Sequence, residues 1–302
     1  MKITTPRGAV VVAVDGTRRS AGAVRYAIGE ARAREGVLHV VHVSSLPYPD
    51  GDLWPAQGHD LEDLIGTGRA ITNAAVSQVA SVAPDLEVVP VHRAGSRVGE
   101  LVKVAASASV LVLGSETREG IGHLFVGATS LETAARADVP VVIVPADWQG
   151  AALGQIVAGV KDVTGSGELL GYAVASAVAR HAELRVVHAV EHPGGGGEPG
   201  PARGPVDVAR ATGAARLRRA VADASGGSVD VELTVDEVAG RPADVLVAAM
   251  ADADLLVVAR HHRKHPHPAR LGHVVRVVLG ASDIPVVVVP PNGRRDPASS
   301  SS

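Results

Sequence analysis

Two short segments of the chain hold the residues best suited to bind a phosphorylated ligand. The longer one, residues 114–130, reads GSETREGIGHLFVGATS; it follows an apolar run and enters a helical stretch at about Ala128. Glycines let backbone N–H groups approach an anion, and a helix N-terminus adds unsatisfied donors and the positive end of its dipole. A triphosphate is the natural ligand for such a loop.

The shorter segment is DGTRRS, residues 15–20, which follows the first apolar run and opens a helical stretch. A carboxylate at this place, Asp15, can accept a hydrogen bond from an adenine amino group or a ribose hydroxyl, as acidic groups do in related α/β sites. Together the two segments predict a site for an adenine nucleotide.

The elements that would position these segments alternate regularly. Val-rich runs at 10–14, 37–43, 86–92, 110–114 and 141–144 predict strands buried on both faces, which is typical of parallel sheets. Ala-rich stretches at 20–34, 61–82, 98–106 and 128–137 predict helices. The alternation predicts an α/β fold with a doubly wound parallel sheet, whose ligands bind at the carboxyl ends of the strands where the strand order reverses.

The same pattern occurs twice in the 302 residues. PVVIVP at 140–145 returns as PVVVVP at 285–290, and Gly127 returns as Gly272, each 145 residues later. The runs at 10–14 and 38–43 return at 156–160 and 184–189, 146 residues later. We therefore predict two tandem five-stranded domains, 8–145 and 154–290, a linker at 146–154 and a disordered Ser-rich tail at 291–302.

Composition excludes several classes of protein. Hydrophobic residues make up 46% and aromatic residues only 2%, so Val, Leu, Ile and Ala must build the cores. The net charge of −3 gives no general attraction to nucleic acid or to acidic lipid. The absence of cysteine excludes disulfides, Cys-ligated zinc and thiol catalysis. No signal-peptide pattern and no membrane-spanning apolar stretch is found, so we expect a cytoplasmic protein without membrane contact.

These residues together resemble the universal stress protein family. The resemblance rests on Asp-Gly-Thr-x-x-Ser at 15–20, LHVVHV at 38–43 and PVVIVP at 140–145, and it covers both halves of the chain. It implies the adenine-nucleotide alpha-hydrolase-like fold of that family and binding of ATP, with Mg²⁺ accompanying the nucleotide. It also implies an intramolecular pseudo-dimer, in which the final strands 141–144 and 286–289 pair edge to edge within one chain.

The family's nucleotide motif is Gly, two residues, Gly, nine residues, Gly, then Ser or Thr. Carried over to this chain, it implies that Asp15 and Val43 line the adenosine pocket and that Gly114 and Gly127 hold the phosphates. The first half departs from the motif at Thr117, in place of the second glycine, and at Ala128, in place of the hydroxyl residue. Thr129, one residue further on, is the alternative source of that hydroxyl.

The second half departs further from the motif. Lys161 stands where Asp15 does; Ala259, His262 and His273 replace the two glycines and the hydroxyl residue, and only Gly272 remains. We therefore expect ATP in the first half only. The basic loop 260–270 has three readings, of which we favour the first: a solvated positive loop, an anion contact by its arginines and Lys264, or a metal site at His262, His265 and His267.

No catalytic motif is present: the chain lacks a Walker A sequence, Gly-x-Ser-x-Gly and His-Glu-x-x-His. His42 and His188 stand at matching strand ends, where a structural hydrogen bond is the favoured interpretation. The sequence therefore predicts a non-enzymatic, nucleotide-sensing stress-response protein. Two alternatives stay open, a ligand-free module that binds a protein partner and a slow ATPase.

Overall fold

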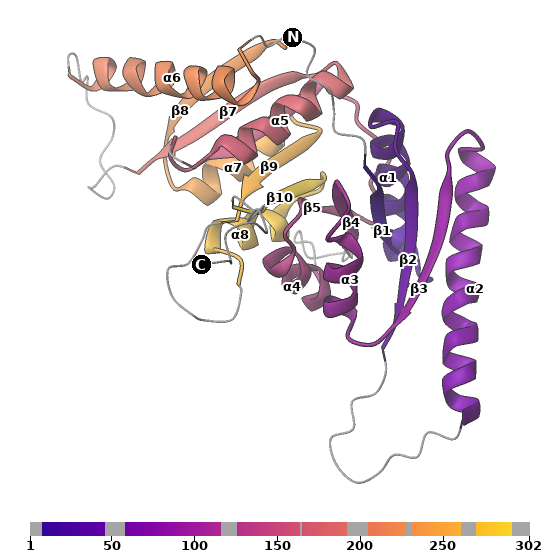
Figure 1. Cartoon of the computed structure of the whole chain (residues 1–302). Coiled ribbons are helices and arrows are strands. Elements are labelled where there is room, and N and C mark those ends of the chain that lie inside the picture. The colour runs from indigo at the N-terminus through magenta and orange to yellow at the C-terminus, as the bar shows by residue number, and fades with distance from the viewer. Residues whose placement is uncertain are drawn as a thin grey trace, which may run out of the picture. The chain divides into compact units, whose positions relative to one another are not determined.

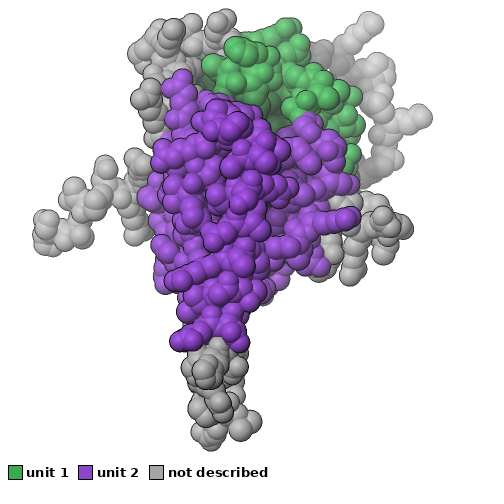
Figure 2. All heavy atoms as spheres, turned by 90° about the vertical axis from the view of Figure 1, so that its right-hand side faces the viewer, with its two compact units in different colours: residues 1–5, 151–266, 272–302 green, residues 6–150, 267–271 purple. Residues whose placement is uncertain are grey.

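The computed structural model describes residues 8–45, 58–115, 126–163, 165–191, 205–227, 231–260 and 270–291. Several features of interest lie outside these ranges, namely Thr117, the histidines of the basic loop and the tail beyond Pro291. The chain divides into two compact units, coloured separately in Figure 2: residues 6–150 with 267–271, and residues 151–266 and 272–302 with 1–5. We call them the first half and the second half, and describe each by itself.

The first half is one parallel sheet with helices between successive strands (Figure 1). Its strand order is β3-β2-β1-β4-β5, so the order reverses between β1 and β4. The elements are β1 (Val10–Ala13), the 3-10 helix η1 (Arg18–Ser20), α1 (Ala21–Ala33), β2 (Leu38–Ser44), α2 (Gly58–Val82), β3 (Val88–Ala94), α3 (Arg97–Ala105), β4 (Val110–Ser115), α4 (Ala128–Arg136) and β5 (Val141–Pro145).

Burial explains why the Val-rich runs become strands. Val10, Val40, Leu111 and Val142 have no exposed surface at all, and their neighbours on the opposite face of the sheet are nearly as buried. Helices cover both faces of such a sheet, so consecutive apolar residues are needed where a one-sided sheet would alternate. The aliphatic composition thus translates directly into the central strands β1 and β4.

The helices begin and end at recognisable residues. Ser96 caps α3, its hydroxyl accepting a hydrogen bond from the N–H of Gly99 at 3.4 Å. After α1 the chain turns at Glu35, which adopts a positive φ of 48°, and the N–H of Gly36 bonds the carbonyl of Ala31. These turns return the chain to the amino end of the next strand, as a parallel sheet requires.

The second half repeats this architecture with strand order β8-β7-β6-β9-β10, again all parallel. The reversal now falls between β6 and β9. The elements are β6 (Gln155–Val160), α5 (Gly167–Arg180), β7 (Glu183–Val190), α6 (Pro205–Ala224), β8 (Leu233–Ala239), α7 (Pro242–Met250), β9 (Leu255–Ala259), α8 (His273–Ala281) and β10 (Val286–Val289).

The predicted α/β class and the two doubly wound parallel sheets are confirmed. The element predicted least well is the third strand, expected at 86–92 and found at Val88–Ala94. A turn over Pro84 and Asp85, closed by a bond from the Leu86 N–H to the Ala83 carbonyl, includes the first of those residues, Leu86. The predicted pairing of 141–144 with 286–289 concerns the placement of the two units and stays a prediction.

Within the ranges that the structure describes, every helix is either too short or too polar to span a lipid bilayer.

Candidate functional site

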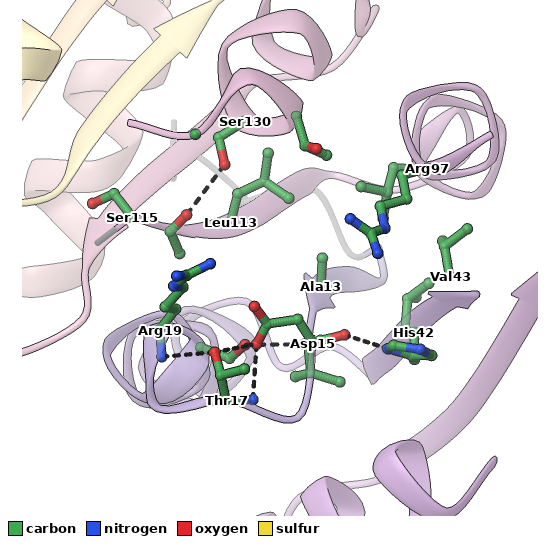
Figure 3. Close-up of a pocket in the computed structure, with 17 residues that line it drawn as sticks. Ala13, Asp15, Thr17, Arg19, His42, Val43, Arg97, Leu113, Ser115 and Ser130 are labelled. Atoms are coloured by element: carbon green, nitrogen blue, oxygen red, sulfur yellow. Dashed lines mark hydrogen bonds between the residues drawn. The ribbon is translucent and has the colours of Figure 1, made fainter. Parts of the chain in front are cut away.

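The first half contains a cavity of about 400 Å³ at the reversal of its strand order. The carboxyl ends of β1 and β4 form its floor, and the starts of η1, α3 and α4 form its walls (Figure 3). This is where a doubly wound sheet places its ligand. The lining residues are Ala13, Val14, Asp15, Thr17, Arg19, Ser20, Val41, His42, Val43, Arg97, Leu101, Leu113, Gly114, Ser115, Gly127, Thr129 and Ser130.

Asp15 is held in place by the turn that follows it. Its Oδ1 accepts hydrogen bonds from the Thr17 N–H at 2.9 Å, the Thr17 hydroxyl at 2.7 Å and the Ser20 hydroxyl at 3.0 Å. Gly16 has a φ of 78° and makes this tight turn possible, because residues with a side chain rarely adopt that backbone conformation. No described residue donates to Oδ2, so one carboxylate oxygen remains available to a ligand.

The same contacts decide the charge of Asp15. Burial acts to raise the pKa of the carboxyl, but the bonds from Thr17 and Ser20 and the nearby charge of Arg19 outweigh it, so the pKa lies below its usual value. Asp15 is therefore ionised at neutral pH and acts only as an acceptor of hydrogen bonds.

The opposite wall of the cavity suits an anion. Helix α4 begins after Gly127, which makes no side-chain cap, and its first turn contains no acidic residue. The first N–H groups of a helix lack partners within the helix and lie at the positive end of its dipole. Thr129 from that turn lines the cavity, and so do the cationic side chains Arg19 and Arg97. Figure 3 shows the Arg97 guanidinium and the Asp15 carboxylate facing the cavity from different elements.

Gly114 has a packing role that its position in the motif does not reveal. A Cβ built at this residue would overlap the carbonyl oxygen of Arg19, so the turn after β1 lies directly against β4 here. The Gly114 carbonyl in turn accepts a hydrogen bond from the Ser130 hydroxyl at 3.1 Å. Gly114 thus brings the Asp15 turn and the start of α4 close enough to share one cavity.

The predicted site residues can now be placed. Five of them, Asp15, Val43, Gly114, Gly127 and Thr129, line the cavity. Ala128 is exposed and is not part of the lining, while Thr117 lies outside the described residues.

Sequence reasoning missed other residues of the lining, above all Arg19, Arg97 and Ser130. Arg97 had a usable signal, because it follows the turn Gly95-Ser96 at the carboxyl end of a predicted strand, the edge where the site was expected. Arg19 and Ser130 lie within the two segments already singled out, but nothing in their spacing distinguishes them from their neighbours.

The strand-end histidines have the structural role that the sequence favoured. The Nδ1 of His42 bonds the Val14 carbonyl at 2.8 Å, and the Nδ1 of His188 bonds the Val160 carbonyl at 2.9 Å. A carbonyl only accepts, so Nδ1 is the protonated nitrogen in each ring. Because the two bonds are equivalent, Val160 corresponds to Val14. Lys161, which follows Val160, therefore corresponds to Asp15.

The second half has its own cavity of about 620 Å³ at the corresponding place. Its lining includes Lys161, Gly272 and His273, with apolar residues from β7, α7, β9 and α8. As to a metal, no three His, Asp or Glu side chains come together among the described residues, and the histidines of the basic loop lie outside them.

Comparisons with known proteins agree on one family. The model of the universal stress protein family matches residues 7–145 and again residues 153–290. Universal stress protein Rv2005c of Mycobacterium tuberculosis is 28% identical over 299 residues, covering 92% of this chain and 96% of its own. A universal stress protein of Mycolicibacterium smegmatis is 26% identical over 291 residues, covering 93% and 97%. The crystal structure of a universal stress protein from Archaeoglobus fulgidus superposes with a TM-score of 0.68 at 19% identity, covering 93% of this chain and 98% of that one.

Proposed function

Because the chain belongs to the universal stress protein family, we propose that its first half binds an adenine nucleotide and that binding, not turnover, is its activity. The observation that carries this proposal is the pairing of two unlike walls in one cavity. An ionised Asp15 lies in the turn after β1, and the open N-terminus of α4 and Arg97 contribute from other elements, while Arg19 adds a second cation from the Asp15 turn itself. A nucleoside phosphate matches both features, because its nucleoside can donate a hydrogen bond to Asp15 and its phosphates carry the negative charge that the arginines and the helix N-terminus attract.

The two walls assign roles to the residues. The free oxygen of Asp15 accepts a hydrogen bond from the adenine amino group or a ribose hydroxyl, and Val43 gives the base an apolar contact. Gly127, the first N–H groups of α4 and the Thr129 hydroxyl hold the phosphates, and the two arginines neutralise their charge. We propose ATP as the nucleotide, with Mg²⁺ accompanying its phosphates.

Two hydroxyls beside the cavity support a binding role over a catalytic one. Ser20 donates to Asp15, and Ser130 donates to the Gly114 carbonyl, so each serves the framework of the site. His42, the imidazole in the lining, uses its N–H on the Val14 carbonyl. We propose that occupancy of the site by nucleotide is the signal, read by a conformational state or by a protein partner.

Titration calorimetry of ATP with Mg²⁺ into the nucleotide-free chain tests the proposal. We expect one site per chain, abolished by Gly127→Val and retained in Gly272→Val. A Cβ at either glycine meets nothing within 4 Å, so both substitutions are compatible with the fold and differ only in the cavity that they fill.

The same preparation separates the alternatives. No binding heat from a chain shown to be free of nucleotide would contradict the proposal and favour a module that binds only proteins. Release of phosphate in proportion to protein, abolished by Asp15→Ala, would contradict the non-catalytic part and favour a slow ATPase.

A further inference from the structure

The cavity of the second half has the size of a ligand site. Its volume of about 620 Å³ falls within the range of about 300–1,000 Å³ that small-molecule pockets span. It lies at the carboxyl ends of β6 and β9, at the reversal of strand order, where the first half has its nucleotide cavity. The residue types around it, however, differ from those of the first half.

Polar side chains of the first cavity are replaced by apolar ones in the second. At the start of α8, Val274 and Val275 stand where α4 has Thr129 and Ser130. Helix α7 begins at Pro242, where α3 begins with Arg97. The Thr129 hydroxyl and the Arg97 guanidinium, which we propose to contact phosphate, and the Ser130 hydroxyl, which bonds the Gly114 carbonyl, are thus absent at these three positions, and each replacement lines the second cavity.

The interior of this cavity is accordingly apolar. Side chains from six elements supply its walls, namely Leu169, Val187, Leu246, Val258, Val275 and Val289. At Gly159, on the central strand, the Leu246 side chain lies 2.8 Å from where a Cβ would stand, so Leu246 fills the place of a side chain on β6. Burial of a hydrocarbon surface is the interaction that such walls offer.

Cationic side chains also line this cavity. Lys161 occupies the place of Asp15, and among the described residues the structure records no ion pair for its ammonium group. Helix α8 begins nearby after Gly272 with no side-chain cap and no acid in its first turn. Arg260 and His273 line the same cavity, and so do three acids: Asp162, which follows Lys161 in the turn after β6, Glu168 in the first turn of α5, and Glu191 after β7.

From this arrangement we propose that the second half binds an apolar molecule that carries a single anionic group, the chemistry of a fatty-acid carboxylate. The hydrocarbon lies against Val187, Leu246 and Val275. The carboxylate bonds the Lys161 ammonium and the first N–H groups of α8. The second half is then a site of different ligand chemistry, whatever the first half binds.

Calorimetric titration of decanoate into the full chain tests this assignment, with decylammonium as the probe of equal length and opposite charge. We expect one decanoate site per chain and weaker or absent binding of decylammonium. Lys161→Gln should weaken decanoate binding about tenfold or more, since it removes a charge-assisted hydrogen bond. Lys103→Gln, at an exposed lysine of α3 whose partner is Glu100, is the matched control and should leave binding unchanged.

Two further variants address the walls and the helix. Ala189→Phe places a ring in the cavity and should abolish decanoate binding. Val274→Asp puts a negative charge in the first turn of α8, where an acid favours the helix, so this variant is expected to fold and to repel the carboxylate. Melting curves establish that each variant is folded.

The proposal is overturned if decanoate does not bind, if decylammonium binds as tightly, or if both Lys161→Gln and Val274→Asp bind decanoate like the wild type. Its fate is separable from that of the nucleotide site. Gly127→Val should abolish ATP binding and leave decanoate binding intact. Lys161→Gln should weaken decanoate binding and leave ATP binding intact.

Discussion

The two cavities occupy the same place in a duplicated fold and differ in the charged and hydroxyl side chains at several matched positions of their linings. Asp15, Arg97 and Thr129 surround the first, while Lys161, Pro242 and Val274 hold the same positions around the second. The strands beneath them keep the same order and the same buried aliphatic residues. Duplication has thus preserved the framework and left the loops after the strands free to acquire different chemistry.

The difference extends to the backbone of the turns. In the first half Gly16 has a positive φ and Gly114 lets the turn lie against β4. In the second half Asp162 and Ala259 stand at those positions, and the positive φ occurs instead at Gly165, with nothing within 4 Å of its Cβ position. The glycine that lets the first turn lie against β4 thus has no glycine counterpart in the second half, where Ala259 stands at that position.

A pair of residues across the second and third strands also differs. His42 lies opposite His92 with the rings stacked 6.1 Å apart, whereas His188 lies opposite Glu237. The first half thus pairs two imidazoles across β2 and β3, and the second half pairs an imidazole with a carboxylate across β7 and β8.

Gly114→Ala should have the largest effect. The new Cβ overlaps a backbone carbonyl that cannot rotate away, so we expect a loss of about 1–3 kcal/mol in the free energy of unfolding, with loss of ATP binding. The reverse exchange at the matched position, Ala259→Gly, should lower the free energy of unfolding by about 0.5–1 kcal/mol at most. Urea denaturation measures both, and equal effects would contradict the close approach in the first half.

Asp15→Asn should weaken ATP binding about tenfold or more, because it removes the negative charge from the proposed acceptor of the adenine or ribose hydrogen bond. Lys161→Gln, at the matched position, should leave ATP affinity unchanged. Calorimetry gives both values. Wild-type ATP affinity in Asp15→Asn would show that the Asp15 carboxylate does not contact the nucleotide.

Lowering the pH should remove the stability that ionised Asp15 contributes to the fold. The pKa of Asp15 is lowered in the folded chain, so the stability that its ionised form contributes is complete above the usual value of 3.8 and is lost as the pH falls below it. Between pH 5 and pH 8 the carboxylate stays ionised. The difference in melting temperature between wild type and Asp15→Asn should therefore be constant in that range and shrink toward pH 3.

Thr129→Val should weaken ATP binding by a smaller factor, about three- to tenfold, which corresponds to one neutral hydrogen bond. The exchange makes the first turn of α4 resemble that of α8. Val274→Thr, the converse change, should not create ATP binding in a chain whose first cavity is filled by Gly127→Val. Unchanged affinity in Thr129→Val would indicate that another group supplies the hydroxyl contact.

The smallest effect expected is the pH dependence that arises from His92. Burial is the main cause that lowers the pKa of His92, and the charges of His42, Arg69 and Arg93 lower it further. The fold therefore favours the neutral ring, and the folded chain binds fewer protons than the unfolded one as the pH falls below 6.5. Stability should decline on acidification from pH 7.5 to pH 5.5.

His92→Gln should reduce that decline, and Arg69→Gln should reduce it by less. Thermal melts at the two pH values give the comparison. An identical decline in wild type and His92→Gln would show that other groups are responsible.

The fold could be predicted from the sequence almost completely, because each strand and helix is indicated by the residue types of its own short segment. Runs such as 110–114 and 141–144 are too apolar to be anything but buried strands, and the stretches between them are too rich in Ala to be strands. The boundary at Val88 was missed because the turn at Pro84 and Asp85 depends on a hydrogen bond that composition does not encode.

The site could be predicted only in part. A motif finds residues that contact a ligand through fixed spacing, as at Asp15 and Gly127. It does not find Arg97, which reaches the cavity from a helix about 80 residues beyond Asp15. Nor does it show that Gly114 is needed to pack the Asp15 turn against β4, because that contact joins segments far apart in the chain.

Hydrogen exchange measured by mass spectrometry, with and without ATP and Mg²⁺, tests most directly the claim that the two halves differ in ligand chemistry. We predict that ATP slows exchange in residues 14–21 and 126–136 of the first half and leaves 160–171 and 272–281 of the second half unchanged. Slower exchange in both sets, or in the second set alone, would contradict the account, and so would no change in either.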